Sequence, residues 1–268
     1  MIRTMQAIKK LLSLAPLFLA STLVSDNRPN ILWIFCDDMA VNVIGAYDSR
    51  FADMNPPPNI DRIANEGKTH NEGHSTDVVT NRALNWFHNM REPNKPFMLM
   101  VHYKAPHRAW IPAERFQEEY QSKTYPEPES LFDNYNTCEP AARNAMEIGR
   151  HIKLDKDLKT DIWPHRAEYL DESLPADELR RRKYQAYMQD YFACVAGVDE
   201  NVGRLLKALE DAGVEENTVV MFSSDQGFYL GGHGWFDKRW MYEESFRTPF
   251  VVKRNVSSMS SPKMCKLQ

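Results

Sequence analysis

Five side chains that could bind a metal ion or an anion stand directly after apolar runs, at widely separated positions. They are Asp37, Asp38, His107, Asp225 and Gln226. Three carboxylates and an amide oxygen are ligands that Ca²⁺ or Mg²⁺ prefers, whereas zinc prefers nitrogen and sulfur. Without a cation, so many close carboxylates would repel one another, and some would take up protons. The pattern predicts a hard-cation site at Asp37, Asp38, Asp225 and Gln226.

A glycine-rich segment with cationic and aromatic residues, 230–244, follows the last of these turns. Its glycines would let a ligand approach the backbone closely. Lys238 or His233 would supply positive charge, and Trp235 and Trp240 could stack on the face of a sugar. The segment therefore suits an anionic substrate. The alternative is an ordinary surface loop with a helix cap.

Each signal alone has a simpler interpretation. An Asp-Asp pair after a strand is often a turn or a helix cap, and a histidine after a proline is often a surface residue. The segment Ser224–Gly227 alone is typical of a turn. Only their shared position at the ends of apolar runs favours one functional site.

The apolar runs predict the strands of a mainly parallel sheet. These runs are 30–35, 97–103 and 218–223. They are continuous, as in strands that are buried on both faces. Helical spacing predicts helices at 76–90 and 176–211, the second followed by Gly213. Alternating strands and helices predict an α/β fold with helices on both faces, and the carboxyl ends of parallel strands share one edge, where ligands bind.

The other segments are less regular. A short helix is predicted at Ile60–Glu66 and a fourth strand at Pro249–Lys253. The stretch Ile111–Leu174 is predicted to be a long surface excursion with one helix near Ala141–Lys153. The tail 254–268 has no periodicity and is predicted to be disordered.

The first 25 residues have the pattern of a signal peptide. Arg3, Lys9 and Lys10 precede the apolar run Leu11–Ala20, which is too short to span a bilayer. The alternative is a buried amphipathic helix. We therefore predict export, to the periplasm or outside the cell, with no further transmembrane segment. The net charge of −4 does not favour nucleic acid as a partner.

The four cysteines form no CxxC pair, so the sequence does not predict a zinc site. Cys36 and Cys194 lie in apolar settings and are predicted to be core residues.

Several longer motifs resemble those of sulfatases, calcium-dependent enzymes of the alkaline-phosphatase-like superfamily. These motifs are the segments 28–38, 58–67, 95–107 and 224–243. The resemblance covers residues 28–253 and is strongest to the bacterial branch similar to N-acetylglucosamine-6-sulfatases and mucin-desulfating enzymes. It implies an α/β/α sandwich of alkaline-phosphatase-like type. It also implies hydrolysis of sulfuric esters on sugars of glycosaminoglycan or mucin type, with a sulfated carbohydrate as partner.

The resemblance also implies roles for individual residues. The four oxygen ligands would hold Ca²⁺, with Mg²⁺ as the alternative. His107 and Lys238 would hold the sulfate oxygens and the leaving oxygen, and His233 would be their neighbour in the active site. The family nucleophile is a formylglycine, made from a Cys or Ser in a Cys/Ser-x-Pro/Ala-x-Arg motif.

That nucleophile motif is absent from this sequence. Residues 67–74 lead directly to a helix that comes much later in relatives, which indicates an internal deletion near 67–74. Cys138–Arg143 is the nearest approximation, but its arginine stands one place too late. The C-terminal subdomain after Lys253 is also missing by this comparison.

The expected fold is therefore a sulfatase N-terminal-type domain over 28–253 that is incomplete and exposes apolar sheet edges. Without its nucleophile, the site is expected to lose most covalent chemistry. Two alternatives stay open: an inactive sugar- or anion-binding relative of sulfatases, and a related hydrolase of phosphate esters.

Overall fold

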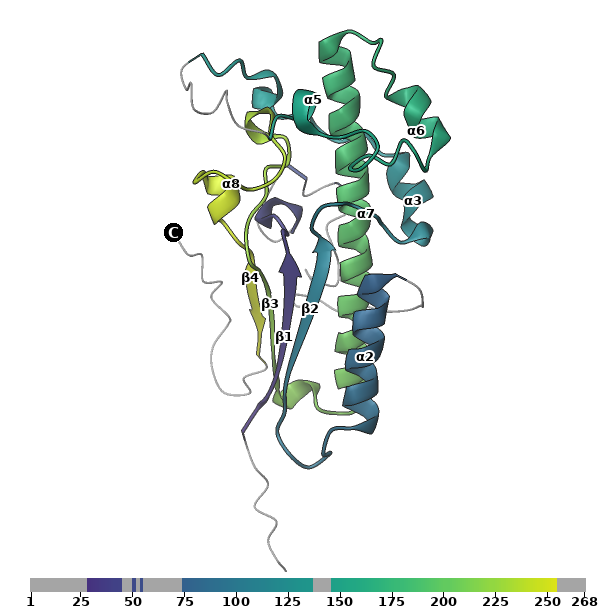
Figure 1. Cartoon of the computed structure of the whole chain (residues 1–268). Helices are drawn as coiled ribbons and strands as arrows, with labels where there is room; N and C mark the ends of the chain where they lie inside the picture. The colour runs from purple at the N-terminus through teal and green to yellow at the C-terminus, as the bar shows by residue number, and fades with distance from the viewer. Residues whose placement is uncertain (1–27, 45–49, 52–53, 55–73, 137–145, 255–268) are drawn as a thin grey trace, which may run out of the picture.

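The computed structural model describes residues 28–44, 50–51, 54, 74–136 and 146–254, and its centre is a four-stranded sheet in the order β2-β1-β3-β4 (Figure 1). β1 (Asn30–Asp37) lies between β2 (Met98–Pro106) and β3 (Thr218–Ser224) and runs parallel to both. β4 (Phe250–Lys253) pairs antiparallel with β3. This mainly parallel sheet with flanking helices confirms the predicted α/β class.

The register of the sheet brings the predicted site turns to one edge. Cys36 of β1 pairs with Tyr103 of β2 and with Ser224 of β3. A bulge between Cys36 and Asp37 then places Asp37 opposite Pro106. The three parallel strands therefore end at similar heights, and the turns that follow them emerge side by side.

Two long helices cover one face of the sheet. α7 (Ala176–Asp211) runs along the strands, and α2 (Ser75–Asn89) lies beside its lower half (Figure 1). Cys36 of β1 and Cys194 of α7 are both buried and free in this core, as predicted. No helix in the described ranges is both long enough and apolar enough to cross a bilayer.

The end of α7 follows the sequence signal. Gly213 has φ of 65°, a left-handed conformation that glycine adopts without steric cost. The Gly213 N–H donates to the carbonyl of Glu210, and the Val214 N–H donates to that of Leu209. These two bonds make a Schellman motif, so the long helix stops where the sequence predicts.

The stretch 111–174 contains more helix than the sequence predicted. Its helical segments are α3 (Glu114–Gln121), the 3₁₀ turn η3 (Glu129–Phe132), α5 (Ile148–His151) and α6 (Pro164–Tyr169). The helix predicted near 141–153 is present only as Ile148–His151 in the described residues, so it is shorter than predicted there. Glu147 is extended since it forms an antiparallel bridge with Trp235.

The remaining short elements are η1 (Val41–Val43), η4 (Glu215–Asn217), η5 (Gly232–Gly234) and α8 (Glu243–Phe246). Four predicted features lie outside the described residues: the signal peptide, the helix at 60–66, Cys138 of the approximate nucleophile motif, and the tail after Arg254.

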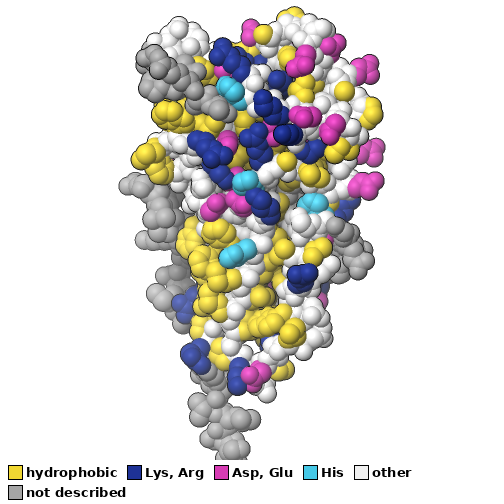
Figure 2. All heavy atoms as spheres, in the orientation of Figure 1, with side chains coloured by type: hydrophobic (Ala, Val, Ile, Leu, Met, Phe, Trp, Pro, Cys, Tyr) yellow, Lys and Arg dark blue, Asp and Glu magenta, His cyan; other side chains and the backbone are white. Residues whose placement is uncertain are grey.

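The other face of the sheet is apolar and partly exposed. Hydrophobic side chains gather over the strands in Figure 2, while Lys, Arg, Asp and Glu lie mostly above them. Met98 and Met100 on the edge strand β2 are 55% and 46% exposed, and Phe250 and Val252 on β4 are each 47% exposed. Among the described elements no helix covers these side chains, so this face of the sheet is partly exposed within the described residues.

Candidate active site

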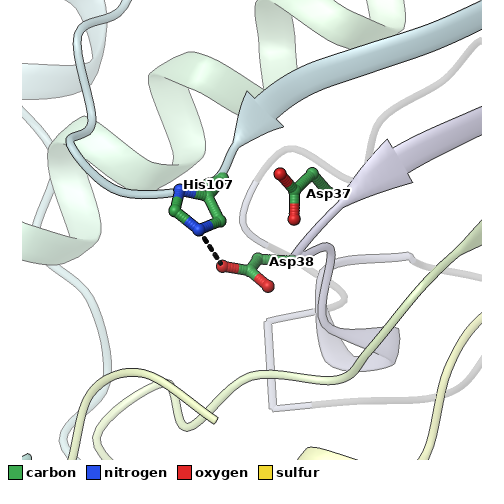
Figure 3. Close-up of side chains that lie close together, drawn as sticks. All are labelled: Asp37, Asp38 and His107. Carbon is green, nitrogen blue, oxygen red and sulfur yellow. Dashed lines mark ion pairs between the residues drawn. The ribbon is translucent and has the colours of Figure 1, made fainter.

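Two neighbouring carboxylates and one histidine form the centre of the site (Figure 3). Asp37 ends β1, Asp38 follows it, and His107 follows β2. One ligand atom from each residue lies within 4.8 Å of the others. The Nε2 atom of His107 is 3.7 Å from Oδ2 of Asp38. Three of the predicted residues, from two parts of the sequence, therefore meet.

A set of buried hydrogen bonds fixes the turn after β1. Asp38 has φ of 67°, which Asp tolerates better than most residues. The Tyr191 hydroxyl donates to the Asp38 carbonyl at 2.6 Å and accepts the Ala40 N–H at 3.0 Å. Ser224 Oγ accepts the Met39 N–H at 2.9 Å. The buried helix α7 and strand β3 thus hold the Asp38 backbone from two sides.

The turn after β3 joins the same corner. Oδ1 of Asp225 accepts the N–H of Asp38 at 3.0 Å, and the Asp225 N–H donates to the Cys36 carbonyl at 3.3 Å. The Gln226 carbonyl accepts a hydrogen bond from the Ser224 hydroxyl at 3.1 Å, so Gln226 begins the segment that leaves this corner. Asp225 thus joins this corner through its carboxylate and Gln226 through its main-chain carbonyl, whereas the described cluster of possible metal ligands is Asp37, Asp38 and His107.

Two lysines offset the negative charge of the pair. The Lys238 ammonium donates to Oδ1 of Asp38 and lies 3.9 Å from Oδ1 of Asp37. Lys104 donates to Oδ2 of Asp37 at 3.0 Å. Lys238 was predicted, whereas Lys104 was missed. Its place three residues before His107, at the end of the same strand, was the available signal.

Asp38 has the more buried carboxylate of the pair, with a side chain that is 1% exposed, against 29% for Asp37. Burial raises the pKa of Asp38 to about 6, although Lys238 and His107 act in the opposite direction. A buried carboxylate beside a second one gains from any positive charge placed between them. The donor set, all oxygen apart from one imidazole, suits Ca²⁺ or Mg²⁺, so the residues present fit a hard divalent cation.

The residues present do not fit the family's formylglycine. The sequence has no Cys/Ser-x-Pro/Ala-x-Arg motif. Cys36 and Cys194 are buried in the core, where burial raises the pKa of both thiols. A formylglycine therefore has no precursor motif in this sequence.

His233 lies in the glycine-rich segment, and its described contacts do not include Asp37 or Asp38. Its Nε2 is 3.4 Å from Oε1 of Glu244, and its ring packs against Trp235 and Tyr242. Trp235 is only 1% exposed, so the prediction that it stacks on a sugar is wrong. Its indole fills a buried aromatic cluster with Met146 instead, whereas Trp240 is partly exposed.

Arg108, next to His107, is held in place by Asp157 and Phe236. Its guanidinium makes two hydrogen bonds, of 2.7 and 2.6 Å, to the buried carboxylate of Asp157, and it lies over the ring of Phe236. These contacts anchor the chain that leaves β2, and so they limit the movement of His107.

The sequence of this chain is similar to those of known proteins. The sulfatase family profile matches residues 69–258. The chain belongs to the sulfatase family. An N-acetylglucosamine-6-O-sulfatase of Bacteroides thetaiotaomicron is 41% identical over 214 residues, which cover 68% of this sulfatase chain and 38% of that relative. The human N-acetylglucosamine-6-sulfatase is 26% identical over 196 residues, covering 71% of this chain and 30% of that one.

The solved structure of BT4656 in complex with its substrate D-glucosamine-2-N,6-O-disulfate is similar to this sulfatase chain, with a TM-score of 0.76 and 28% identity. The match covers 85% of this chain and 71% of that one. This chain spans well under half the length of the two sulfatases compared by sequence, 38% of the bacterial one and 30% of the human one. This likeness supports the alkaline-phosphatase-like architecture predicted from the sequence.

Proposed function

We propose that this sulfatase chain binds and hydrolyses sulfate esters of sugars at the carboxylate site, with Ca²⁺ as its cation. One observation carries the proposal. Asp37 and Asp38 at the end of β1, His107 directly after β2 and Lys238 of the glycine-rich segment converge at one sheet edge. Negative groups that bind a cation stand beside positive groups that suit an anion, which is what an ester of sulfuric acid requires.

The proposed cation ligands are Asp37, Asp38, Asp225 and Gln226. When bound, the cation would polarise the sulfate and stabilise negative charge that develops on its oxygens. Lys238 now neutralises the two carboxylates, and with the cation in place its ammonium is available to hold a sulfate oxygen. His107 stands at the rim of the pair, 31% exposed, and would donate a proton to the leaving sugar oxygen.

The proposed substrate class is a sulfated amino sugar. The support comes from two similar proteins, an N-acetylglucosamine-6-O-sulfatase and a protein whose structure was solved with a disulfated glucosamine. His233 and the partly exposed Trp240 stand on the segment that also carries Lys238. We propose that they contact the sugar rather than the sulfate.

The missing nucleophile motif limits the expected rate. Without a covalent nucleophile, the binding and electrostatic contributions alone are expected to leave only a small part of the turnover of a complete enzyme. The absence of the motif favours one second candidate, a sulfated-sugar-binding relative without turnover. A hydrolase of phosphate esters is the other alternative.

One set of measurements separates these candidates. Binding of glucosamine 6-sulfate would be measured by calorimetry with EDTA and with Ca²⁺, and sulfate release would be followed in parallel. We expect binding that depends on Ca²⁺ and weakens by about tenfold or more in Lys238→Ala, because a charge-assisted contact is lost. The matched control is Lys95→Ala, since Lys95 is 69% exposed and pairs only with nearby Glu92 in the described residues.

The outcomes are distinct. Sulfate release that Lys238→Ala abolishes supports hydrolysis, and Ca²⁺-dependent binding without release supports the binding candidate. Faster release of phosphate from an aryl phosphate than of sulfate from an aryl sulfate supports the phosphoesterase. Binding that ignores both Ca²⁺ and Lys238→Ala contradicts the proposed site.

We further propose export, with cleavage of the first 25 residues as a signal peptide and a sulfatase domain over 28–253. The support is the basic and apolar pattern of the N-terminus. Expression in a Gram-negative host followed by fractionation and N-terminal sequencing tests it. A full-length N-terminus in the cytoplasmic fraction contradicts it.

A further inference from the structure

A cavity of about 350 Å³ lies between α3, α6 and α7 and shares no lining residue with the candidate active site. Figure 1 shows α3 and α6 on the same side of the upper half of α7. Among the residues that line the cavity are Lys123 and Thr124 after α3, His165, Arg166 and Tyr169 of α6, and Gln189 of α7. Its volume falls within the range of small-molecule sites, and one sugar unit would fill much of it.

The walls of this cavity are held in place. The Gln189 side chain donates to the Lys123 carbonyl at 2.8 Å, which ties the end of α3 to α7. The buried Arg166 binds both oxygens of Asp190 at 2.9 and 3.0 Å, which ties α6 to α7. Walls fixed in this way lose little entropy when a ligand binds.

The aromatic residue of the cavity has a held backbone and one ring face in contact with an arginine. Arg182 lies over the ring of Tyr169, 5.1 Å from its centroid, and donates to the Tyr169 carbonyl at 3.1 Å. The Tyr169 side chain is nevertheless 39% exposed. A partly exposed ring beside hydrogen-bonding groups is a surface on which a sugar ring can stack.

The chemistry of the lining limits the ligand. None of the described residues that line the cavity is Asp or Glu, so it does not suit a metal cation. Asp190 neutralises Arg166, and Glu119 accepts a hydrogen bond from Lys123 at 2.7 Å. The Lys123 side chain is 20% exposed, and its ammonium lies 3.9 Å from the centroid of the Tyr120 ring. Its partner Glu119 is 57% exposed, and an ion pair with such an exposed partner is weak, so an anionic group can compete for the lysine.

We propose that this cavity is a second saccharide-binding site, which takes one sugar unit carrying a sulfate or carboxylate group. The sugar ring contacts Tyr169, its hydroxyl groups bond to Gln189 and Thr124, and its anionic group lies at Lys123 and His165. The site binds an acidic polysaccharide at a point apart from the carboxylate pair. It does not depend on whether that pair holds a cation.

The first test uses the wild-type chain in EDTA and maps the ligand by hydrogen exchange. Glucosamine 6-sulfate and glucuronate are the charged probes, with N-acetylglucosamine and inorganic sulfate as the comparisons. We expect the charged sugars to protect residues 121–124 and 165–169. Equal protection by the neutral sugar or by sulfate alone, or no protection there, overturns the proposal.

The second test uses variants. Lys123→Gln and Tyr169→Ala are expected to weaken binding of the charged sugars in EDTA by about tenfold, because each removes one main contact. Lys95→Gln is the matched control on an exposed surface, and thermal unfolding checks that all variants fold. Unchanged affinity in both cavity variants overturns the proposal.

The proposals for the two sites can be contradicted independently of each other. Lys238→Ala should leave protection at the cavity unchanged, while Lys123→Gln should leave Ca²⁺-dependent binding at the carboxylate pair unchanged. Loss of cavity protection in Lys238→Ala would show a single site and overturn the second one.

Discussion

The Tyr191 hydroxyl donates a hydrogen bond of 2.6 Å to the carbonyl of Asp38, and both side chains are buried. The same hydroxyl accepts the Ala40 N–H at 3.0 Å. A single group in the middle of α7 therefore closes the turn that aims the Asp38 carboxylate. The long helix supports the sheet and also positions the candidate metal ligands.

Tyr191→Phe is expected to lower the free energy of unfolding by about 1–2 kcal/mol, because the buried Ala40 N–H and Asp38 carbonyl lose their partner. We also expect weaker Ca²⁺ binding, measured by calorimetry. Tyr187→Phe is the matched control, since its buried hydroxyl donates to the Tyr229 carbonyl at 3.4 Å. An equal loss of Ca²⁺ affinity in both variants would argue against a specific role for Tyr191.

Lys238→Met is expected to destabilise the cation-free protein by about 3 kcal/mol, because two neighbouring carboxylates lose their most buried counter-charge. Added Ca²⁺ should restore much of this loss, measured by urea unfolding. Lys104→Met is the control, because the Lys104 side chain is 63% exposed and its ion pair should contribute about 1 kcal/mol or less. Equal effects of both variants in EDTA would contradict this electrostatic account.

In EDTA, the titration of Asp38 should contribute to the pH dependence of the unfolding free energy. Burial raises the pKa of Asp38 from 3.8 to about 6, so the folded state binds this proton more tightly than the unfolded state. The associated stabilisation is present below pH 3.8 and is lost as the pH rises through about 6. Unfolding free energies between pH 4 and 7 should therefore fall less steeply in Asp38→Asn than in the wild type. Parallel pH curves for the two proteins would contradict a role of Asp38 titration in stability.

Asp77→Asn is expected to lower stability by about 2 kcal/mol, since Asp77 joins three helices. Its buried carboxylate on α2 accepts bonds of 2.9 and 2.8 Å from Arg115 of α3 and one of 2.7 Å from Asn201 of α7. Burial raises the pKa of Asp77, but the bonds from Arg115 and Asn201 outweigh it, so the net shift is downward from 3.8.

This stabilisation is therefore present above pH 3.8 and is lost as the pH falls below that value. The difference between wild type and Asp77→Asn in urea unfolding should shrink at low pH. Glu92→Gln is the control, because Glu92 is 69% exposed. A difference that stays constant down to pH 2 would exclude the titration of Asp77 as its source.

Met100→Lys is expected to reduce the binding of the dye ANS, because Met100 stands on the sheet face that no described helix covers. Its effect on unfolding free energy should be within about 0.5 kcal/mol, since the side chain is already half exposed. Met241→Lys is the control, as Met241 is 83% exposed and lies outside the strands. Equal loss of dye fluorescence in both variants would show that the dye does not bind the sheet.

Local patterns were enough to predict the main elements. The continuous apolar run of β1, the helical spacing of α7 and its Gly213 stop are properties of neighbouring residues, and the structure has them where the sequence placed them. The convergence of Asp37, Asp38 and His107 was also predictable. Parallel strands put their carboxyl ends at one edge, whatever the length of chain between them.

The sequence by itself determined the strands, the long helix, the order of the acidic turns and the family likeness, because each depends on local spacing or on continuous motifs. Only the tertiary structure decided that Trp235 is buried, that Glu147 is extended and that Tyr191 holds the Asp38 turn. These facts depend on contacts between segments distant in the chain. Packing partners, rather than residue type, decide whether an aromatic ring faces a ligand or the core.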